Sequence, residues 1–185
     1  MTGFEFGLVP VAIIIGFALT QILIGWGKVV RQWSMLQNPG LFLSFTGFAM
    51  AGILSHFVGD WAYRDIELHY GRLILIILPT LAMVLAISVI LPNDAEFPTN
   101  LREHYFNYAS KSSGLFGIGI LLSIIPDLLP GAANIPQAWM VGMVLIPLGC
   151  MAAMRQTVVH VLSHVVVWTM LLLQMSSLTS FGAIQ

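Results

Sequence analysis

The sequence has very few charged residues for its length. Of its 185 residues, 8% are Asp, Glu, Lys or Arg and 58% are hydrophobic, whereas an ordinary soluble domain is about 25% charged. A water-soluble protein of this size could not bury so much apolar surface. The composition therefore excludes an ordinary soluble domain and predicts an integral membrane protein whose apolar residues contact membrane lipids.

The chain also lacks a basic run, a second cysteine and a linker. Its formal net charge is −1 and no stretch combines clustered Lys and Arg with aromatic residues, so no nucleic acid is expected as a partner. The single cysteine, Cys150, excludes an intrachain disulfide and a CxxC pair. Because no linker or cleavable signal sequence is recognisable, residues 1–185 are expected to form one transmembrane domain.

What the sequence has instead is a series of long apolar stretches without charge. Each approaches the roughly 20 residues that a helix needs to cross the hydrocarbon core. Continuous runs favour helices, since strands of a barrel would alternate. We therefore predict an all-α membrane protein, a bundle of about six transmembrane helices. The expected spans are about 7–29, 41–61, 73–91, 114–129, 138–154 and 158–178.

A polar segment separates the third and fourth spans. Asn100 is a predicted N-cap, and Glu103 stands at the capping-box position three residues later. Leu101, Tyr105 and Tyr108 would then share one face. This pattern predicts a short helix in the cytoplasmic interface, and a helical extension of the fourth span into water is equally consistent with it.

The distribution of positive charge predicts the orientation in the membrane. Lys28, Arg31, Arg102, Lys111 and Arg155 fall on one side of the predicted spans, and Arg64 and Arg72 fall on the other. Because positive residues are retained on the cytoplasmic side, both termini are expected on the non-cytoplasmic side. Trp26 and Trp33 are expected at the inner membrane interface, where indole rings prefer to lie.

In the second span, His56, Asp60 and Arg64 follow at every fourth position and so share one helical face. They could form an access point for ions or protons, with Asp60 setting the protonation of His56. The preferred interpretation is a charge-paired helix end. Asp127 also has two interpretations. It could place a carboxylate in a pathway, or it could simply mark the end of a helix, and the helix end is preferred.

Two histidines lie one turn apart in the sixth span, His160 and His164, and Trp168 follows one turn later. Such a pair can bind a metal, but no acidic third ligand lies nearby in the sequence. A haem would need an axial histidine at a matching depth, and His56 is expected too far away. We therefore favour hydrogen bonds between helices, the role also expected for Gln21 and Gln174.

Small residues recur at spacings that let membrane helices approach closely. The predicted packing residues are Gly16, Thr20, Gly47, Ala51, Gly114, Gly117 and Gly119. The 10 methionines and 11 phenylalanines add adaptable apolar surface. Such surface suits other subunits, lipid, or a flat ligand such as a quinone or pigment.

Three segments carry a resemblance to known sequences. They are the apolar segment 13–25 followed by Lys28 and Arg31, the Leu91-Pro92 exit from the third span, and residues 100–106. Together they resemble a loosely defined group of uncharacterised bacterial inner-membrane proteins with about six spans. The resemblance covers about the first two thirds of the chain. It implies a multi-pass protein of the bacterial inner membrane and assigns no catalytic residue.

No enzyme is expected, because the sequence has no Ser-His-Asp grouping, phosphate-binding Gly-Lys-Ser/Thr loop or paired catalytic carboxylates. The predicted function is a non-catalytic membrane subunit. It would assemble with itself or with a larger bacterial membrane complex through its small-residue faces, and lipid, quinone or pigment are its candidate ligands. A small channel or transporter for ions, protons or solutes is the alternative, followed by a b-type haem protein.

Overall fold

The computed structural model describes residues 3–60, 70–92, 97–125 and 138–181, and helices are the only extended secondary structure in this part of the chain. Asp60, Arg64 and Asp127 lie at or beyond the edges of these ranges, so their predicted roles fall outside the described side chains. The helices are α1 (Gly3–Arg31), the 3-10 turn η1 (Trp33–Met35), α2 (Gly40–Asp60), α3 (Tyr70–Ile90), α4 (Leu101–Ser123), α5 (Ala138–Ala153) and α6 (Thr157–Phe181).

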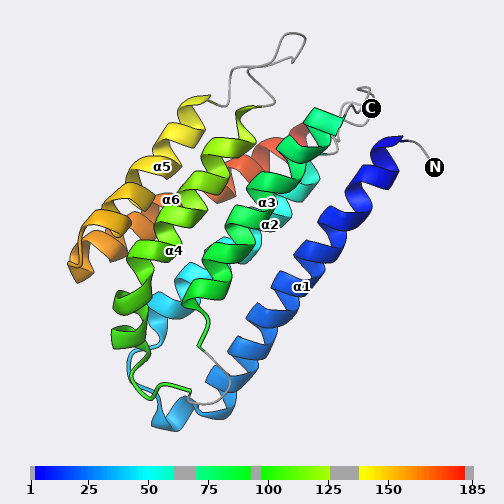
Figure 1. The fold of residues 1–185 in the computed structure, drawn as a ribbon. Helices are drawn as coiled ribbons and strands as arrows, with labels where there is room; N and C mark the ends of the chain where they lie inside the picture. The colour runs from blue at the N-terminus through cyan, green and yellow to red at the C-terminus, as the bar shows by residue number, and fades with distance from the viewer. Residues whose placement is uncertain (1–2, 61–69, 93–96, 126–137, 182–185) are drawn as a thin grey trace.

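The long helices form a bundle in which chain neighbours pack side by side (Figure 1). The most extensive packing joins α3 to α4, α4 to α5, and α5 to α6. Helix α2 contacts α6, α4 and α3, so it closes the bundle across the chain order. Helix α1 lies at one edge and packs on α3 and α2. One whole side of α1 is therefore left without a described neighbour.

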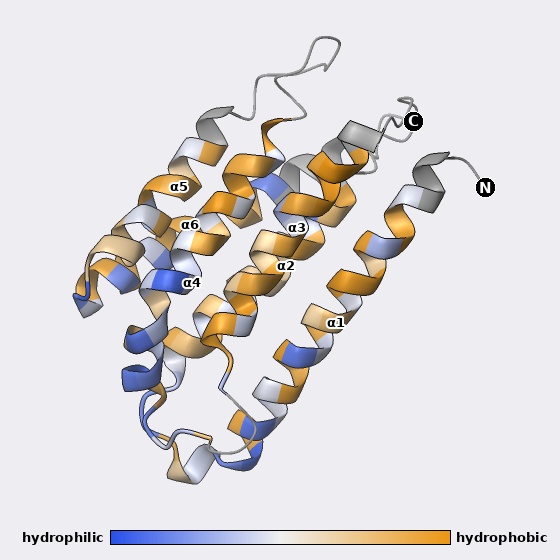
Figure 2. Cartoon of the chain, viewed as in Figure 1, coloured by the Kyte–Doolittle hydropathy of each residue, from blue (hydrophilic) through white to orange (hydrophobic). Residues whose placement is uncertain are grey.

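Four of the helices are long and apolar enough to cross a membrane. They contribute the segments Gly7–Arg31, Gly40–Gly59, Leu73–Ile90 and Thr157–Gln174. The colouring by hydropathy shows apolar residues along most of their length (Figure 2). The chain is therefore a multi-pass membrane protein. The apolar segment of α5 is shorter, and α4 begins with several polar residues, so crossing by these two helices stays a prediction.

The segment before the predicted fourth span differs from the expected interfacial helix. The structure has one continuous helix, α4, in place of a separate helix near 100–110 and a span beginning at 114. Asn100 caps its start, accepting a hydrogen bond from the backbone N–H of Glu103 at 3.1 Å. No proline or loop interrupts the chain after this cap, so the helix continues. Tyr105 is fully buried against other helices, whereas Tyr108 is 40% exposed.

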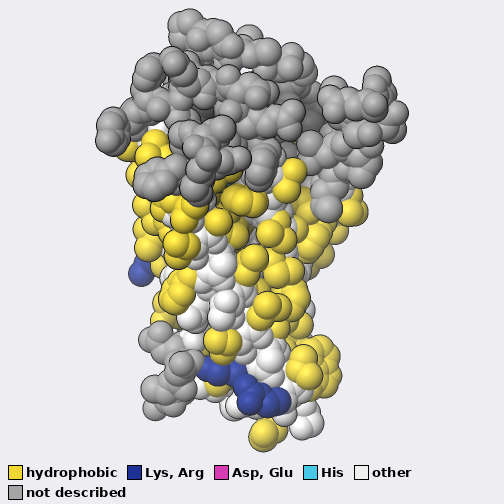
Figure 3. Space-filling view, turned by 90° about the vertical axis from the view of Figure 1, so that its right-hand side faces the viewer, with side chains coloured by type: hydrophobic (Ala, Val, Ile, Leu, Met, Phe, Trp, Pro, Cys, Tyr) yellow, Lys and Arg dark blue, Asp and Glu magenta, His cyan; other side chains and the backbone are white. Residues whose placement is uncertain are grey.

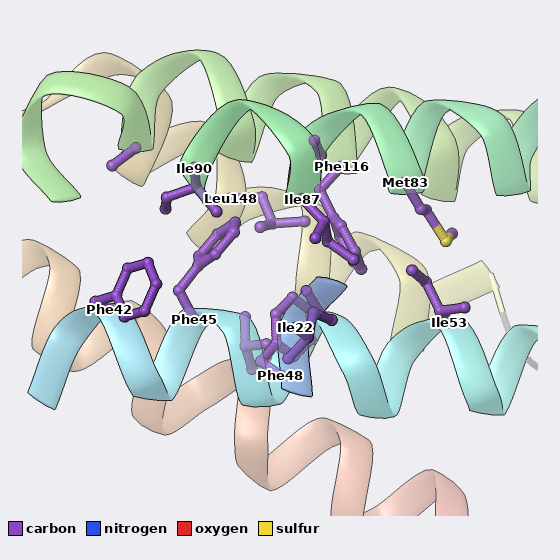
Figure 4. Packing of buried hydrophobic residues seen from close by; sticks show 14 of the residues in the cluster. Ile22, Phe42, Phe45, Phe48, Ile53, Met83, Ile87, Ile90, Phe116 and Leu148 are labelled. Carbon is purple, nitrogen blue, oxygen red and sulfur yellow. The ribbon is translucent and has the colours of Figure 1, made fainter. Parts of the chain in front are cut away.

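The core of the bundle is rich in aromatic side chains. Phe42, Phe45 and Phe48 project from α2 toward α3 and α4 (Figure 4). Phe116 of α4 lies 5.1 Å from Phe48 between ring centroids, and edge-to-face geometry dominates among these rings. Because every third or fourth residue of α2 here is a buried phenylalanine, one face of this helix forms the centre of the packing.

Several hydroxyl groups in the helices obtain partners either within their own helix or on the next one, whereas the buried hydroxyls of Ser55 and Ser113 have none among the described residues. Thr80 and Ser88 of α3 donate to backbone carbonyls four residues earlier. Ser112 of α4 instead donates to the carbonyl of Ala86 on α3 at 2.6 Å. Both patterns satisfy hydroxyl groups that lipid cannot solvate. The second also fixes α4 on α3.

Most of the predicted inner-side cations gather toward one end of the molecule, which we call the basic end. It is defined by Lys28 and Arg31 in the last turn of α1, Arg102 in the first turn of α4 and Arg155 between α5 and α6. Lys111 lies about 15 Å further along α4 at 1.5 Å per residue. Figure 3 shows dark-blue Lys or Arg side chains near the lower end of the molecule. Two contacts join the elements that meet there. The backbone N–H of Gln37 donates to the carbonyl of Thr99 at 3.0 Å, and the Arg102 guanidinium donates to the Thr157 hydroxyl at 2.8 Å. That this end faces the cytoplasm stays a prediction.

The predicted packing glycines have different surroundings. Gly47 of α2 lies between two indoles, since an added Cβ would meet Trp168 at 3.3 Å and Trp26 at 3.5 Å. The Trp26 N–H donates to the hydroxyl of Thr46 at 2.9 Å, so this indole also packs inward between helices. At Gly16 and Gly114, an added Cβ would meet no described atom within 4 Å.

Three other predicted small residues pack inside the bundle. Ala51 packs against the core, and a Cβ at Gly117 would lie in ordinary contact with Leu145 and Leu148. Gly119 has the closest approach. A Cβ there would lie 2.7 Å from Met83 Cγ and 3.0 Å from the carbonyl oxygen of Pro79. The backbones of α3 and α4 therefore touch at this position.

We expect Gly119→Ala to destabilise the protein, because the new methyl group meets backbone atoms that cannot rotate away. Overpacking of this kind costs about 1–3 kcal/mol. Gly114→Ala on the same helix is the matched control and should be neutral or stabilising by up to about 1 kcal/mol, because alanine favours the helix. Thermal unfolding in detergent measures both, and equal unfolding temperatures for the two variants would contradict the α3–α4 contact.

Candidate functional site

A buried polar cluster lies where α4, α5 and α6 meet near the basic end. Its members are Tyr105 of α4 and His160 and His164 of α6, whose exposed fractions are 0%, 1% and 7%. The two histidines face the same neighbour because they stand one helical turn apart. The Tyr105 hydroxyl lies 2.8 Å from Nδ1 of His160 and 3.1 Å from Nε2 of His164.

The direction of these hydrogen bonds follows from the backbone at the end of α5. Nε2 of His160 lies 2.7 Å from the carbonyl oxygen of Met154. A carbonyl only accepts, so Nε2 carries the proton and Nδ1 of neutral His160 is an acceptor. The Tyr105 hydroxyl therefore donates to His160 Nδ1. Its oxygen is then left to accept from Nε2–H of His164.

This assignment leaves one atom of the cluster without a partner. With the proton of neutral His164 on Nε2, Nδ1 is an acceptor. The Nδ1 atom is buried and makes no hydrogen bond within the described part of the chain. An unsatisfied buried polar group costs about 1–3 kcal/mol. The His164 ring is thus half satisfied, whereas both nitrogens of His160 are engaged.

Apolar and aromatic side chains surround the cluster. The rings of Phe45 and Phe106 lie 6.2 Å from His164 and 4.9 Å from His160 between centroids. The sulfur of Met151 lies 3.7 Å from the Tyr105 hydroxyl. Together these residues keep water from the three polar groups. The cluster therefore acts as a directed hydrogen-bond chain in a low-dielectric environment.

The geometry of this cluster does not resemble a metal site. Among the described residues, no group of three or more His, Cys, Asp or Glu could hold a metal ion. Binding of a metal or haem iron through His160 would break its hydrogen bonds to Tyr105 and Met154. The arrangement instead joins three helices through the Tyr105 hydroxyl.

A shallow, open groove runs along the outside of the cluster, between α2 and α6. Its volume is about 440 Å³. The groove is lined by Leu41, Ser44, Val161, His164, Val165, Trp168, Thr169 and Leu172. The Trp168 indole N–H donates to the Ser44 hydroxyl at 3.1 Å. His164 thus belongs both to the buried cluster and to the wall of this groove.

The remaining predicted polar residues lie apart from the cluster. His56 is partly buried on α2, and about 18 Å of helix separates it from Ser44 at 1.5 Å per residue. Gln21 on α1 and Gln174 on α6 are each partly buried. The structure therefore brings His160 and His164 together with a tyrosine, and not with His56.

Sequence reasoning missed the roles of Tyr105 and Ser44. Tyr105 was expected on the face of an interfacial helix. The only feature of the sequence that indicated its burial is that it shares a helix face with apolar Leu101. Its partners lie 55 and 59 residues away in the sequence, so no local spacing connects them. Ser44 carried no signal, because a single serine in an apolar helix is commonplace.

Comparison with protein-family models, curated proteins and solved structures gives no match to this chain.

We expect Tyr105→Phe to lower the stability of the bundle. Removing the hydroxyl leaves His160 Nδ1 and His164 Nε2 without their shared partner, at about 1–3 kcal/mol for each unsatisfied group. Tyr108→Phe, which changes a partly exposed hydroxyl on the same helix, is the control and should change stability by less than about 0.5 kcal/mol. Thermal unfolding in detergent distinguishes them, and equal stability of both variants would contradict the hydrogen-bond chain.

Proposed function

We propose that this chain is a non-catalytic membrane subunit that docks through α1 onto a second membrane helix, either of another copy or of a larger bacterial membrane complex. The observation that carries this proposal is the side of α1 that faces away from the bundle. There, Gly16 and Thr20 are both exposed, and an added Cβ at Gly16 would meet no described atom within 4 Å.

The outward side of α1 has the features of a helix-packing face. Gly16 and Thr20 stand four residues apart, the spacing that allows two membrane helices to approach closely. The Thr20 hydroxyl donates to the Gly16 carbonyl at 2.8 Å, so a partner helix need not satisfy it. Ile13 and Phe17, exposed by 67% and 61%, flank this small-residue site. They provide apolar side chains that can pack around a second helix.

Most of the other predicted small residues already pack inside the chain, and Gly114, where an added Cβ would meet no described atom within 4 Å, is half-buried and not exposed. Gly47, Gly117 and Gly119 contact side chains or backbone of neighbouring helices, so they are not available to a partner. Between lipid-exposed helices, association depends on close packing and not on the hydrophobic effect. Gly16 and Thr20 therefore form the part of the described small-residue pattern that suits a partner best.

The buried polar cluster supports a non-catalytic role. The cluster has six hydrogen-bonding groups, namely the donor and the acceptor of the Tyr105 hydroxyl and the four ring nitrogens of His160 and His164. Five of them are engaged with one another or with the Met154 carbonyl. This favours a structural link among α4, α5 and α6.

The haem alternative finds less support in the positions of the histidines. His56 lies about 24 Å along α2 from Gly40, whereas His160 lies about 5 Å along α6 from Thr157, counting 1.5 Å per residue. Both helices begin at the basic end. The histidines therefore stand at different depths, which argues against one haem held between His56 and His160.

Cysteine crosslinking tests the docking face. In a Cys150→Ala background, Gly16→Cys should crosslink to a partner in native membranes when a short thiol-reactive reagent is added. Ile74→Cys is the matched control, because Ile74 is 59% exposed on α3 at a similar distance from the basic end and should crosslink at least tenfold less. A dimer band shows self-association, and a larger adduct shows a different partner.

Equal, low crosslinking from Gly16→Cys and Ile74→Cys, with both variants folded, would overturn the docking proposal. Thr20→Cys provides a second position on the same face and should behave as Gly16→Cys does.

A further inference from the structure

Two of the residues that line the groove between α2 and α6 carry hydrogen-bonding groups that the described part of the protein leaves incomplete. One is the buried Nδ1 of His164, an acceptor without a partner within the described residues. The other is the hydroxyl of Ser44, whose oxygen accepts from Trp168 while its own proton makes no described hydrogen bond. A ligand hydroxyl complements this pair, because it can donate to His164 and accept from Ser44.

The charge of the groove restricts its ligand further. None of the residues that line it is Lys, Arg, Asp or Glu. A phosphate or carboxylate bound here would lose water without gaining a counter-charge, which is unfavourable. The groove therefore fits a neutral headgroup and disfavours an anionic phospholipid, whose phosphate would be drawn to the cations of the basic end.

The depth of the groove indicates how such a ligand would lie. Ser44 stands about 6 Å along α2 from Gly40, and His164 about 10 Å along α6 from Thr157. Leu172 stands about 22 Å along α6 from the same end. The polar groups are thus nearer the basic end and the aliphatic wall continues toward the membrane centre. A headgroup would lie beside Ser44 and His164, with an apolar tail along α6.

Trp168 favours an aromatic headgroup. Its indole packs in part against Gly47 and lines the groove one turn from His164. Its N–H is already donated to Ser44, and the half-buried ring offers its remaining surface for packing. Aromatic rings pair in offset or edge-to-face arrangements and gain stability beyond their buried area. The volume of about 440 Å³ lies within the range of small-molecule sites.

From these features we infer that the α2–α6 groove binds a neutral, lipid-soluble phenol or hydroquinone. Its hydroxyl hydrogen-bonds with His164 Nδ1 and Ser44, its ring packs on Trp168, and its tail follows Val165 and Leu172. Tyr105 is a positioning residue, because its hydroxyl holds the His164 ring by Nε2. Since Nδ1 is buried, binding includes a small movement of the groove side chains.

This site goes beyond docking through α1, and it shares no residue with that face. Failure of one proposal would therefore leave the other standing.

Equilibrium binding in phosphatidylcholine nanodiscs tests the site, with anaerobic, radiolabelled decyl-hydroquinone as the probe. The intact protein should bind it saturably. Ser44→Ala and His164→Phe should each raise the Kd about tenfold or more, because each removes one partner of the hydroxyl. Ser88→Ala, a serine hydroxyl on α3 bonded within its own helix, is the matched control and should leave the Kd unchanged.

Two further comparisons test the chemistry of the ligand. The dimethyl ether of the same probe, which has no hydroxyl proton, should bind at least tenfold more weakly. Neither 1-dodecanol nor phosphatidylglycerol should displace the hydroquinone at equal concentration. Should His164→Phe fail to fold in a thermal unfolding assay, Ser44→Ala and the dimethyl ether still decide the question.

The inference is overturned if the probe does not bind saturably, or if the dimethyl ether binds as tightly as the hydroquinone. Displacement by 1-dodecanol would contradict the inference that the headgroup is aromatic. Displacement by phosphatidylglycerol would contradict the inference that it is neutral.

Discussion

In the hydrocarbon core of a membrane, a polar group must find its partner within the protein, because lipid supplies none. This constraint accounts for most of the specific contacts in the bundle. Thr80 and Ser88 use carbonyls of their own helix, whereas Ser112 bonds across to α3. The Tyr105 hydroxyl serves the same purpose for two histidines at once, and in doing so links α4 to α6.

Several buried polar atoms in the described part of the chain are exceptions to this constraint, the hydroxyls of Ser55 and Ser113 among them, and one is informative because of the residue that carries it. Nδ1 of His164 remains without a partner among the described residues although the ring is buried, and His164 also lines the α2–α6 groove. A membrane protein gains nothing from such an atom in isolation, since it lowers stability. Because His164 lines the groove, a ligand bound there would supply the hydrogen-bond partner that the packing of the helices does not.

Some of the small residues pack inside the bundle, and others face away from it. Gly47 and Gly119 occupy positions where neighbouring side chains or backbone leave no space, so they are required by the fold. Gly16 belongs to the same kind of small-residue spacing in the sequence, but it faces away from the bundle. Sequence spacing alone treats these positions alike, because it records which residues share a helix face and not which face meets another helix.

The sequence by itself determined that this is an all-helical, multi-pass membrane protein, and it placed most helices to within a few residues, because low charge and continuous apolar runs are local properties. It did not determine that α4 is one continuous helix, since a capping signal marks only where a helix begins. Tertiary structure alone decided that Tyr105 joins His160 and His164 and that Ser44 lies on Trp168. These partners are far apart in the chain, and only the packing of α2, α4 and α6 brings them within hydrogen-bonding distance.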